Sequence, residues 1–250
     1  MTDKTKGKKK IVAIIQARMG SERLPGKVMM PICGKAILEW VVLRVGKSKL
    51  VDQLAVATSR KVIDTPIVKL CDKLGIECFR GSERNVLQRF YLAARKLGAD
   101  IIVRITADCP FIDPKIIDKM IKIHLKNDND YTATASGDSY PRGLDVEVFN
   151  WKTLKTAYEK AIAPGHKEHV TSFIYDRLGE FKIEIVPAPK GAERPDYRLC
   201  VDEREDLALA RKVYKQFAPL GDFTFKEVIE FLDENPKITG INKNVKQKAI

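Results

Sequence analysis

The hydrophobic residues of this chain fall into two kinds of segment that alternate along its first half. Short apolar runs such as residues 11–15 (IVAII) are rich in β-branched side chains and suit strands that are buried on both faces. The segments between these runs space their apolar residues as amphipathic helices do. The pattern predicts strands at residues 11–15, 54–58, 76–79 and 101–105, and helices at residues 36–47, 64–74, 85–97 and 113–126.

Local signals mark the ends of several of these helices. Gly75 and Gly98 each follow a helical pattern, at the position where a left-handed cap costs glycine little. Asp113 and Pro114 have the residue types of an N-cap and a first helical turn. Strands that alternate with helices in this way predict a parallel sheet covered on both faces.

The pattern is less regular in the second half of the chain. Thr224 and Glu227 form a capping-box pattern ahead of a last helix, which ends before Pro236. The other expected elements are strands at residues 131–135, 144–149, 181–186 and 197–201, and helices at residues 151–162, 167–178 and 204–217. Because there is no internal repeat and no long linker, we expect one α/β domain over residues 11–235, with a mainly parallel twisted sheet. We expect a basic, disordered tail at residues 1–10 and a basic C-terminal tail at residues 236–250.

The loop at residues 16–27 (QARMGSERLPGK) contains the first candidate chemistry. It leaves the carboxyl end of the first strand and combines Gly20 and Ser21 with three cations, Arg18, Arg23 and Lys27. Backbone N–H groups surrounded by positive charges are typical of a phosphate-binding loop. The spacing matches neither the P-loop nor the dinucleotide motif, and an ordinary turn with solvated charges is the alternative.

Two aspartates follow predicted strands. Asp108 comes after residues 101–105, and Asp202 comes after the apolar residues 199–201. Open α/β sheets bind ligands at the carboxyl ends of their strands, so these carboxylates could meet over the loop and hold Mg²⁺. For Asp202 the alternative is an N-cap of the next helix.

Five motifs in a fixed order support one family resemblance. They are residues 14–27, 79–83 (FRGSE), 104–110 (RITADCP), 140–149 (YPRGLDVEVF) and 168–171 (EHVT). Together they resemble the cytidylyltransferases that make CMP-activated sugar acids, in particular the branch named for spore coat polysaccharide biosynthesis. The CMP-Kdo and CMP-acylneuraminate synthetases are similar more distantly. The resemblance implies a Rossmann-like fold of the nucleotide-diphospho-sugar transferase type.

The resemblance also implies an activity and a nucleotide site. CMP would pass from CTP to a sugar acid or a similar small acid, with release of pyrophosphate and with Mg²⁺ as cofactor. Asp108 and Asp202 would bind the metal, and Arg18 and Lys27 would neutralise the β- and γ-phosphates. Thr106 stands where the Kdo enzymes carry Gln, so the resemblance supports cytosine as the base of the nucleotide less strongly than it supports nucleotide binding. The residues implied near the nucleotide are Ala17, Arg18, Gly20, Ser21, Arg23, Lys27, Gly81, Ser82 and Thr106.

The acceptor would be bound by Arg142, Asp145 and His169. A guanidinium suits a carboxylate or a phosphate, although Arg142 could equally be a surface arginine. His166 and His169 do not have the spacing of helical zinc ligands, so we do not expect a zinc site there.

Charge and hydropathy narrow the other possibilities. The net charge is +12, but residues 1–10 carry +4 and residues 243–250 carry +3, and no aromatic side chains alternate with these lysines. Nucleic-acid binding is therefore not favoured. The absence of a membrane-length apolar segment indicates a cytoplasmic protein. A homodimer is left open, and the alternative functions are a glycosyltransferase, which usually marks its metal with Asp-x-Asp, and a non-catalytic sugar-nucleotide binding protein.

Overall fold

The central element of the fold is a seven-stranded sheet, seen in a computed structural model that describes residues 7–177 and 179–247. Its strands are β1 (Ile11–Gln16), β4 (Gln53–Ser59), β5 (Glu77–Gly81), β6 (Ile101–Thr106), β7 (Tyr131–Thr134), β8 (Glu147–Asn150) and β9 (Ile183–Val186). Their order across the sheet is β5-β4-β1-β6-β8-β7-β9. Within the described part of this sheet, β8 pairs antiparallel with both of its neighbours and the other pairings are parallel, so the prediction of a mainly parallel sheet is confirmed. Two short strands, β2 (Pro31–Ile32) and β3 (Lys35–Ala36), form a separate hairpin.

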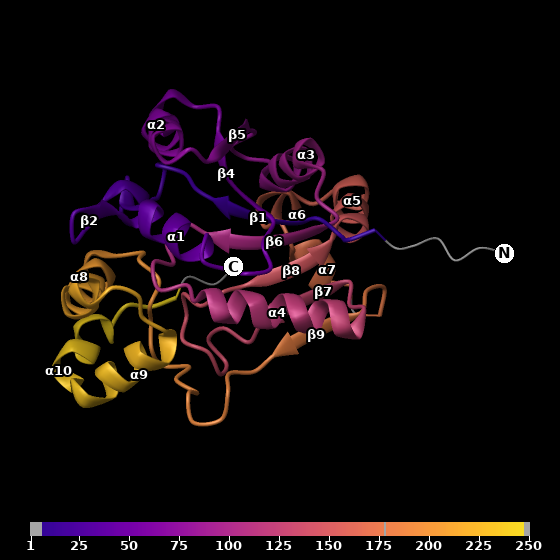
Figure 1. Cartoon of the computed structure of the whole chain (residues 1–250). Helices are drawn as coiled ribbons and strands as arrows, with labels where there is room; N and C mark the ends of the chain where they lie inside the picture. The colour runs from indigo at the N-terminus through magenta and orange to yellow at the C-terminus, as the bar shows by residue number, and fades with distance from the viewer. Residues whose placement is uncertain (1–6, 178, 248–250) are drawn as a thin grey trace.

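Helices cover both faces of the sheet (Figure 1). The longer ones are α1 (Ile37–Val45), α2 (Thr65–Leu74), α3 (Val86–Leu97), α4 (Pro114–Asn127), α5 (Trp151–Lys160), α8 (Arg204–Phe217) and α9 (Phe225–Glu234). The shorter ones are α6 (Pro164–Glu168), α7 (Ser172–Tyr175), α10 (Pro236–Thr239) and the 3₁₀ turns η1 (Lys27–Met29), η2 (Val62–Asp64), η3 (Ala218–Leu220) and η4 (Gly240–Asn242).

Strand β1 shows why the sheet has two hydrophobic faces. Ala13 and Ile15 belong to the core cluster that includes α1, α4 and α8, whereas Val12 and Ile14 belong to the cluster that includes α3 and α5. Because strand side chains alternate between faces, a continuous apolar run buries both sides of the strand. Fully burying each isoleucine contributes about 1.5–3 kcal/mol, which makes β1 the natural centre of the sheet.

Several predicted helix ends are confirmed. Gly75 and Gly98 end α2 and α3 in the left-handed conformation, with φ of 66° and 62°. The Asp113 carboxylate caps α4 by accepting from the N–H of Lys115 at 2.7 Å. The capping box of Thr224 and Glu227 is present at the start of α9.

The strand predicted at residues 197–201 is not formed. This segment makes a single isolated bridge, between Arg198 and Arg142. Further along the segment, the N–H of Val201 donates to the carbonyl of Asp108, in the loop after β6, at 2.8 Å. The segment therefore crosses the carboxyl edge of the sheet, and apolar content alone did not distinguish this path from a strand.

The single helix predicted at residues 167–178 is also wrong. The chain forms the short helices α6 and α7, and between them His169 has the extended backbone angles φ −101° and ψ 98°. This break brings Val170 and Phe173 into full burial. Residue 178 lies outside the described part of the chain.

The segments expected as tails contact the domain where the structure describes them. Lys8 pairs with Asp52 at 2.6 Å, and the N–H of Lys10 donates to Asp100 at 2.7 Å. Helix α10 and turn η4 pack beside α8 and α9 through Ile238 and Ile241 (Figure 1). Among the described residues, no helix has the length and apolarity needed to cross a membrane.

Candidate active site

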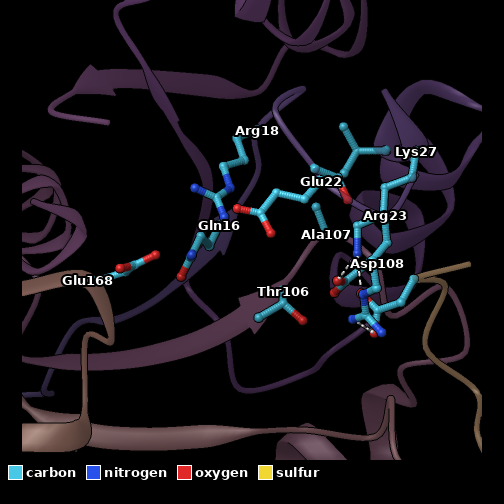
Figure 2. Close-up of a pocket in the computed structure, with 12 residues that line it drawn as sticks. Gln16, Arg18, Glu22, Arg23, Lys27, Thr106, Ala107, Asp108 and Glu168 are labelled. Carbon is cyan, nitrogen blue, oxygen red and sulfur yellow. Dashed lines mark hydrogen bonds and ion pairs between the residues drawn. The ribbon is translucent and has the colours of Figure 1, made fainter. Parts of the chain in front are cut away.

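A cleft of about 360 Å³ lies at the carboxyl ends of β1 and β6. Gln16 ends β1 and pairs in register with Thr106, which ends β6. Asp108 follows two residues later, so the two strands place their succeeding loops side by side. Figure 2 shows that Glu168, at the end of α6, faces this space from a separate ribbon. The lining residues are Gln16, Arg18, Ser21, Glu22, Arg23, Lys27, Val28, Thr106, Ala107, Asp108, Glu168 and Asp202.

The ammonium group of Lys27 lies between the two predicted metal ligands. Its Nζ is 2.5 Å from Oδ2 of Asp108 and 2.7 Å from Oδ1 of Asp202. Burial disfavours the charged amine, but the two carboxylates outweigh this effect and raise the pKa of Lys27. The structure therefore brings together the two aspartates that the sequence placed at the same edge.

Two further cations, Arg23 and Arg198, form ion pairs with Asp202. Oδ2 of Asp202 lies 2.9 Å from the guanidinium of Arg23 and is also hydrogen-bonded by Arg198. The alternative role as a helix cap is wrong, because Glu203 is the N-cap of α8 and forms a capping box with Asp206. The side chain of Asp202 is thus directed to cations at the cleft.

The loop between β1 and η1 is held partly by its own amides. The N–H groups of Ser21 and Gly26 both donate to the carbonyl of Met19 at 2.9 Å. The N–H of Met19 donates in turn to the buried carboxylate of Asp64, at 2.7 Å. Since these three donors are used within the fold, a phosphate-binding role of the loop would depend chiefly on Arg18, Arg23 and Lys27, and less on the amides than the sequence suggested.

Asp64 was not singled out in the sequence. It is 2% exposed, and its second oxygen accepts from the N–H and hydroxyl of Ser59. Asp64 therefore joins the end of β4 to the loop after β1. Its position just before α2 had suggested only a helix start.

The remaining residues implied for the nucleotide lie in two places. Thr106 lines the cleft. Ala17 is buried and directly follows Gln16, another lining residue, in the chain. Gly81 ends β5, where a Cβ atom would come within 2.8 Å of Cγ of Arg89. Ser82 acts as a turn residue, since its hydroxyl accepts from the N–H of Asn85 at 3.0 Å.

A second cavity adjoins the turn at Ser82. It has a volume of about 490 Å³ and shares Arg18 and Glu168 with the first cleft. Its lining residues are Arg18, Glu83, Arg84, Asn85, Pro164, Lys167 and Glu168. The two cavities together give the carboxyl edge of the sheet room for more than a triphosphate.

The three predicted acceptor residues lie outside the lining of both cavities. The guanidinium of Arg142 packs against Gly137, and its backbone pairs with Arg198. Asp145 is held by the N–H of Gly143 at 2.8 Å, and burial raises the pKa of its carboxyl group. His169 occupies the break between α6 and α7. Their acceptor roles stay predictions.

A largely buried polar network beside Gln16 was missed by the sequence analysis. Arg104 on β6 pairs with Glu147 on β8 and donates to Oε1 of Gln16 at 3.2 Å. Glu147 also accepts from the hydroxyls of Tyr131 and Thr171, at 2.6 and 2.7 Å. The network ties β6, β7 and β8 to the wall of the cleft. An arginine inside an otherwise apolar strand was the available signal.

The comparisons with known proteins agree with this geometry. A family model described as cytidylyltransferase matches residues 12–230. The chain belongs to the cytidylyltransferase family. It is therefore a nucleotidyltransferase, and the predicted family and fold class are confirmed.

Three relatives of this cytidylyltransferase show how far the similarity extends. An uncharacterized protein of Methanocaldococcus jannaschii is 41% identical over 240 residues, which are 96% of this chain and 97% of that protein. The spore coat polysaccharide biosynthesis protein SpsF of Bacillus subtilis is 36% identical over 231 residues, covering 90% and 95%. A cytidylyltransferase structure from Leptospira borgpetersenii superposes with a TM-score of 0.89 at 31% identity, covering 97% of this chain and all of that one.

The carboxylates at the cleft are of the ligand type that a hard divalent cation prefers. Asp108 and Asp202 offer only oxygen ligands, and both already contact one positive centre, Nζ of Lys27. Across residues 7–177 and 179–247, no group of three histidine, cysteine, aspartate or glutamate side chains is arranged to hold a metal by itself. Any ion held here would take its remaining ligands from substrate or water, as Mg²⁺ usually does.

Proposed function

We propose that this cytidylyltransferase moves CMP from CTP to a sugar acid or a similar small acid, with release of pyrophosphate. The observation that carries the proposal is the position of Lys27 between Asp108 and Asp202, at the carboxyl ends of β1 and β6. This edge is where open α/β sheets bind nucleotides. The similarity to SpsF supports an acceptor used in polysaccharide biosynthesis.

The charges of the cleft support a role for Mg²⁺. Three lining residues are cations, namely Arg18, Arg23 and Lys27, and four are carboxylates, namely Glu22, Asp108, Glu168 and Asp202. The lining thus carries one more negative than positive charge, which alone would repel a triphosphate. Asp108 and Asp202 would hold the Mg²⁺, whose positive charge would stabilise the phosphate oxygens.

The protein side chains would act by position and charge. Lys27 and Arg18 would neutralise the phosphates that leave as pyrophosphate, where negative charge increases as the reaction proceeds. The attacking oxygen would come from the acceptor, so the enzyme needs no nucleophile of its own. Arg142, Asp145 and His169 remain our candidates for holding the acceptor's acidic group and hydroxyls.

Release of pyrophosphate tests the proposal. The full chain is incubated with Mg²⁺, one nucleoside triphosphate and a set of small acids that includes 2-keto sugar acids. We expect release to require both CTP and an acid, and to be much slower with ATP, GTP or UTP. Release that is indifferent to the acid, or that prefers another triphosphate, would contradict the proposal.

A further inference from the structure

Arg198 lies behind the cleft, and its guanidinium group is shared among three side chains. Nε donates to Asp206 at 3.1 Å, Nη1 donates to Oε1 of Gln247 at 2.6 Å, and Nη2 donates to Oδ2 of Asp202. The residue is 7% exposed. A planar guanidinium can bind acceptors in three directions at once, whereas a lysine offers only a point charge.

The C-terminal segment 242–247 binds both the backbone and the side chain of Arg198. Asn242, in turn η4, is 5% exposed, and its Nδ2 donates to the carbonyl of Arg198 at 2.9 Å and to Asp206 at 2.8 Å. Gln247 holds the guanidinium itself. Both the backbone and the side chain of Arg198 are therefore fixed by residues beyond the last core helix.

The contact of Arg198 with Asp202 fixes how the Asp202 carboxylate is oriented at the cleft. Oδ1 of Asp202 faces Lys27 at 2.7 Å, while Oδ2 is taken by Arg198 and by Arg23. Residues 197–201 make only one bridge with a neighbouring segment, and the backbone of Asp202 is held by its N–H, which donates to Asp206 at 2.9 Å. The contacts of its side chain with Lys27, Arg23 and Arg198 then select which oxygen faces the cleft.

We propose that Arg198 is a positioning residue for Asp202 and that the C-terminal segment 242–247 completes the active site by holding Arg198. This inference rests on the proposed function for its kinetic consequences, but the placement of Asp202 is a property of the chain alone. It changes the expected role of the basic C-terminal segment, from a tail outside the domain to a support for a carboxylate of the cleft.

The first test replaces the planar guanidinium group of Arg198 by the single ammonium group of a lysine. Arg198→Lys keeps the positive charge, so a purely electrostatic role would leave kcat nearly unchanged. We expect kcat to fall about 100-fold, the effect of a misplaced group that acts on the reacting centre through another. KM for the acid acceptor should stay within about twofold. An unchanged kcat would overturn the positioning role.

The second test leaves Arg198 in place and shortens the chain. A protein that ends at Lys246 loses Gln247, and a protein that ends at Gln247 is the matched control. We expect the shorter protein to lose about three- to tenfold in kcat, as the loss of one charge-assisted hydrogen bond would produce, and the control to match the full chain. Equal kcat in the two would remove the C-terminal segment from the proposal.

Asn242→Ala provides a third comparison, with its exposed neighbour Asn244→Ala as the control. We expect the Asn242 variant to lower kcat and the Asn244 variant to leave it unchanged. If Asn242→Ala lowers only the melting temperature, with kcat per folded molecule intact, the segment has a purely structural role and the proposal fails.

Crystal structures of the full chain and of Arg198→Lys separate this proposal from the proposed function. We expect the Asp202 carboxylate to rotate or shift in the variant, whatever substrate the enzyme uses. An inactive full chain with a displaced Asp202 in the variant would reject the proposed function and support the positioning role. An active full chain with Asp202 unmoved in the variant would do the reverse.

Discussion

Nζ of Lys27 lies 2.5 Å from Oδ2 of Asp108, although the two residues are 81 positions apart in the chain. The contact joins the loop after β1 to the loop after β6. Lys27 is 7% exposed, so its charge is taken out of water and must be compensated by the carboxylates beside it. The contact thus fixes the positions of Lys27 and Asp108 relative to each other, and it holds the two loops together at the cleft.

Asp108→Asn should lower kcat by about 100-fold or more, because it removes one of the two charges that would hold Mg²⁺. Pyrophosphate release, measured with and without a chelator, checks this expectation. Asp128→Asn is a suitable control, since Asp128 is exposed and has the left-handed backbone, at φ 47°, that asparagine accepts. Full activity of Asp108→Asn, or activity that survives chelation, would contradict the metal assignment.

Lys27→Ala should weaken CTP binding and slow turnover together, because one charge serves both the bound substrate and the transition state. The variant also leaves Asp108 and Asp202 close together without their shared cation, so it should melt at a lower temperature. Titration calorimetry with CTP, turnover and thermal melting measure the three effects. If CTP affinity and kcat are both unchanged, Lys27 acts only in stability.

Glu147→Gln should destabilise the fold by about 3 kcal/mol or somewhat less, because it leaves the largely buried Arg104 without its partner charge. Burial opposes the ionisation of Glu147, but Arg104 and the hydrogen bonds from Tyr131 and Thr171 outweigh it and hold the pKa below the ordinary 4.5. The stabilisation is therefore complete above about pH 4.5 and is lost as the pH falls through the lower, folded-state pKa. Urea unfolding of both proteins from pH 3 to pH 7 measures the destabilisation and its pH dependence. If the variant loses stability at low pH as steeply as the original chain, Glu147 is not the source of that loss.

Arg142→Ala should raise KM for the acid acceptor much more than KM for CTP. The guanidinium packs against Gly137 in the loop between β7 and β8, and a guanidinium suits an anionic group. Arg95→Ala on the exposed last turn of α3 controls for the loss of an arginine. A variant that is defective for CTP and normal for the acceptor would move Arg142 to the nucleotide side.

The sequence was informative where one local cause determines the structure. The run at residues 11–15 could be buried only in a central strand, and Asp108 followed directly from the end of β6. Helix caps such as Gly98 and Asp113 were also predictable from the sequence, because each acts on the unpaired backbone groups at the end of its own helix.

The remainder depends on contacts between distant segments. Residues 197–201 are as apolar as a strand, but they cross the sheet edge because they bond to Asp108 and Arg142. Asp64 binds the N–H of Met19, 45 positions away, and Arg198 binds Gln247, 49 positions away. Spacing alone pointed to Asp202 and gave no sign that Arg198 and Gln247 would support it.

The fate of a phosphorus label tests the central claim most directly. The enzyme is given Mg²⁺, an accepted acid and CTP that is radiolabelled at either the α- or the γ-phosphorus. We predict that the α-label appears in the product joined to the acid and that the γ-label appears in pyrophosphate, since the cleft binds the phosphates that leave. Transfer of the γ-label to the acid, or failure to join the α-label to any acid, would contradict the assignment of this site to cytidylyl transfer.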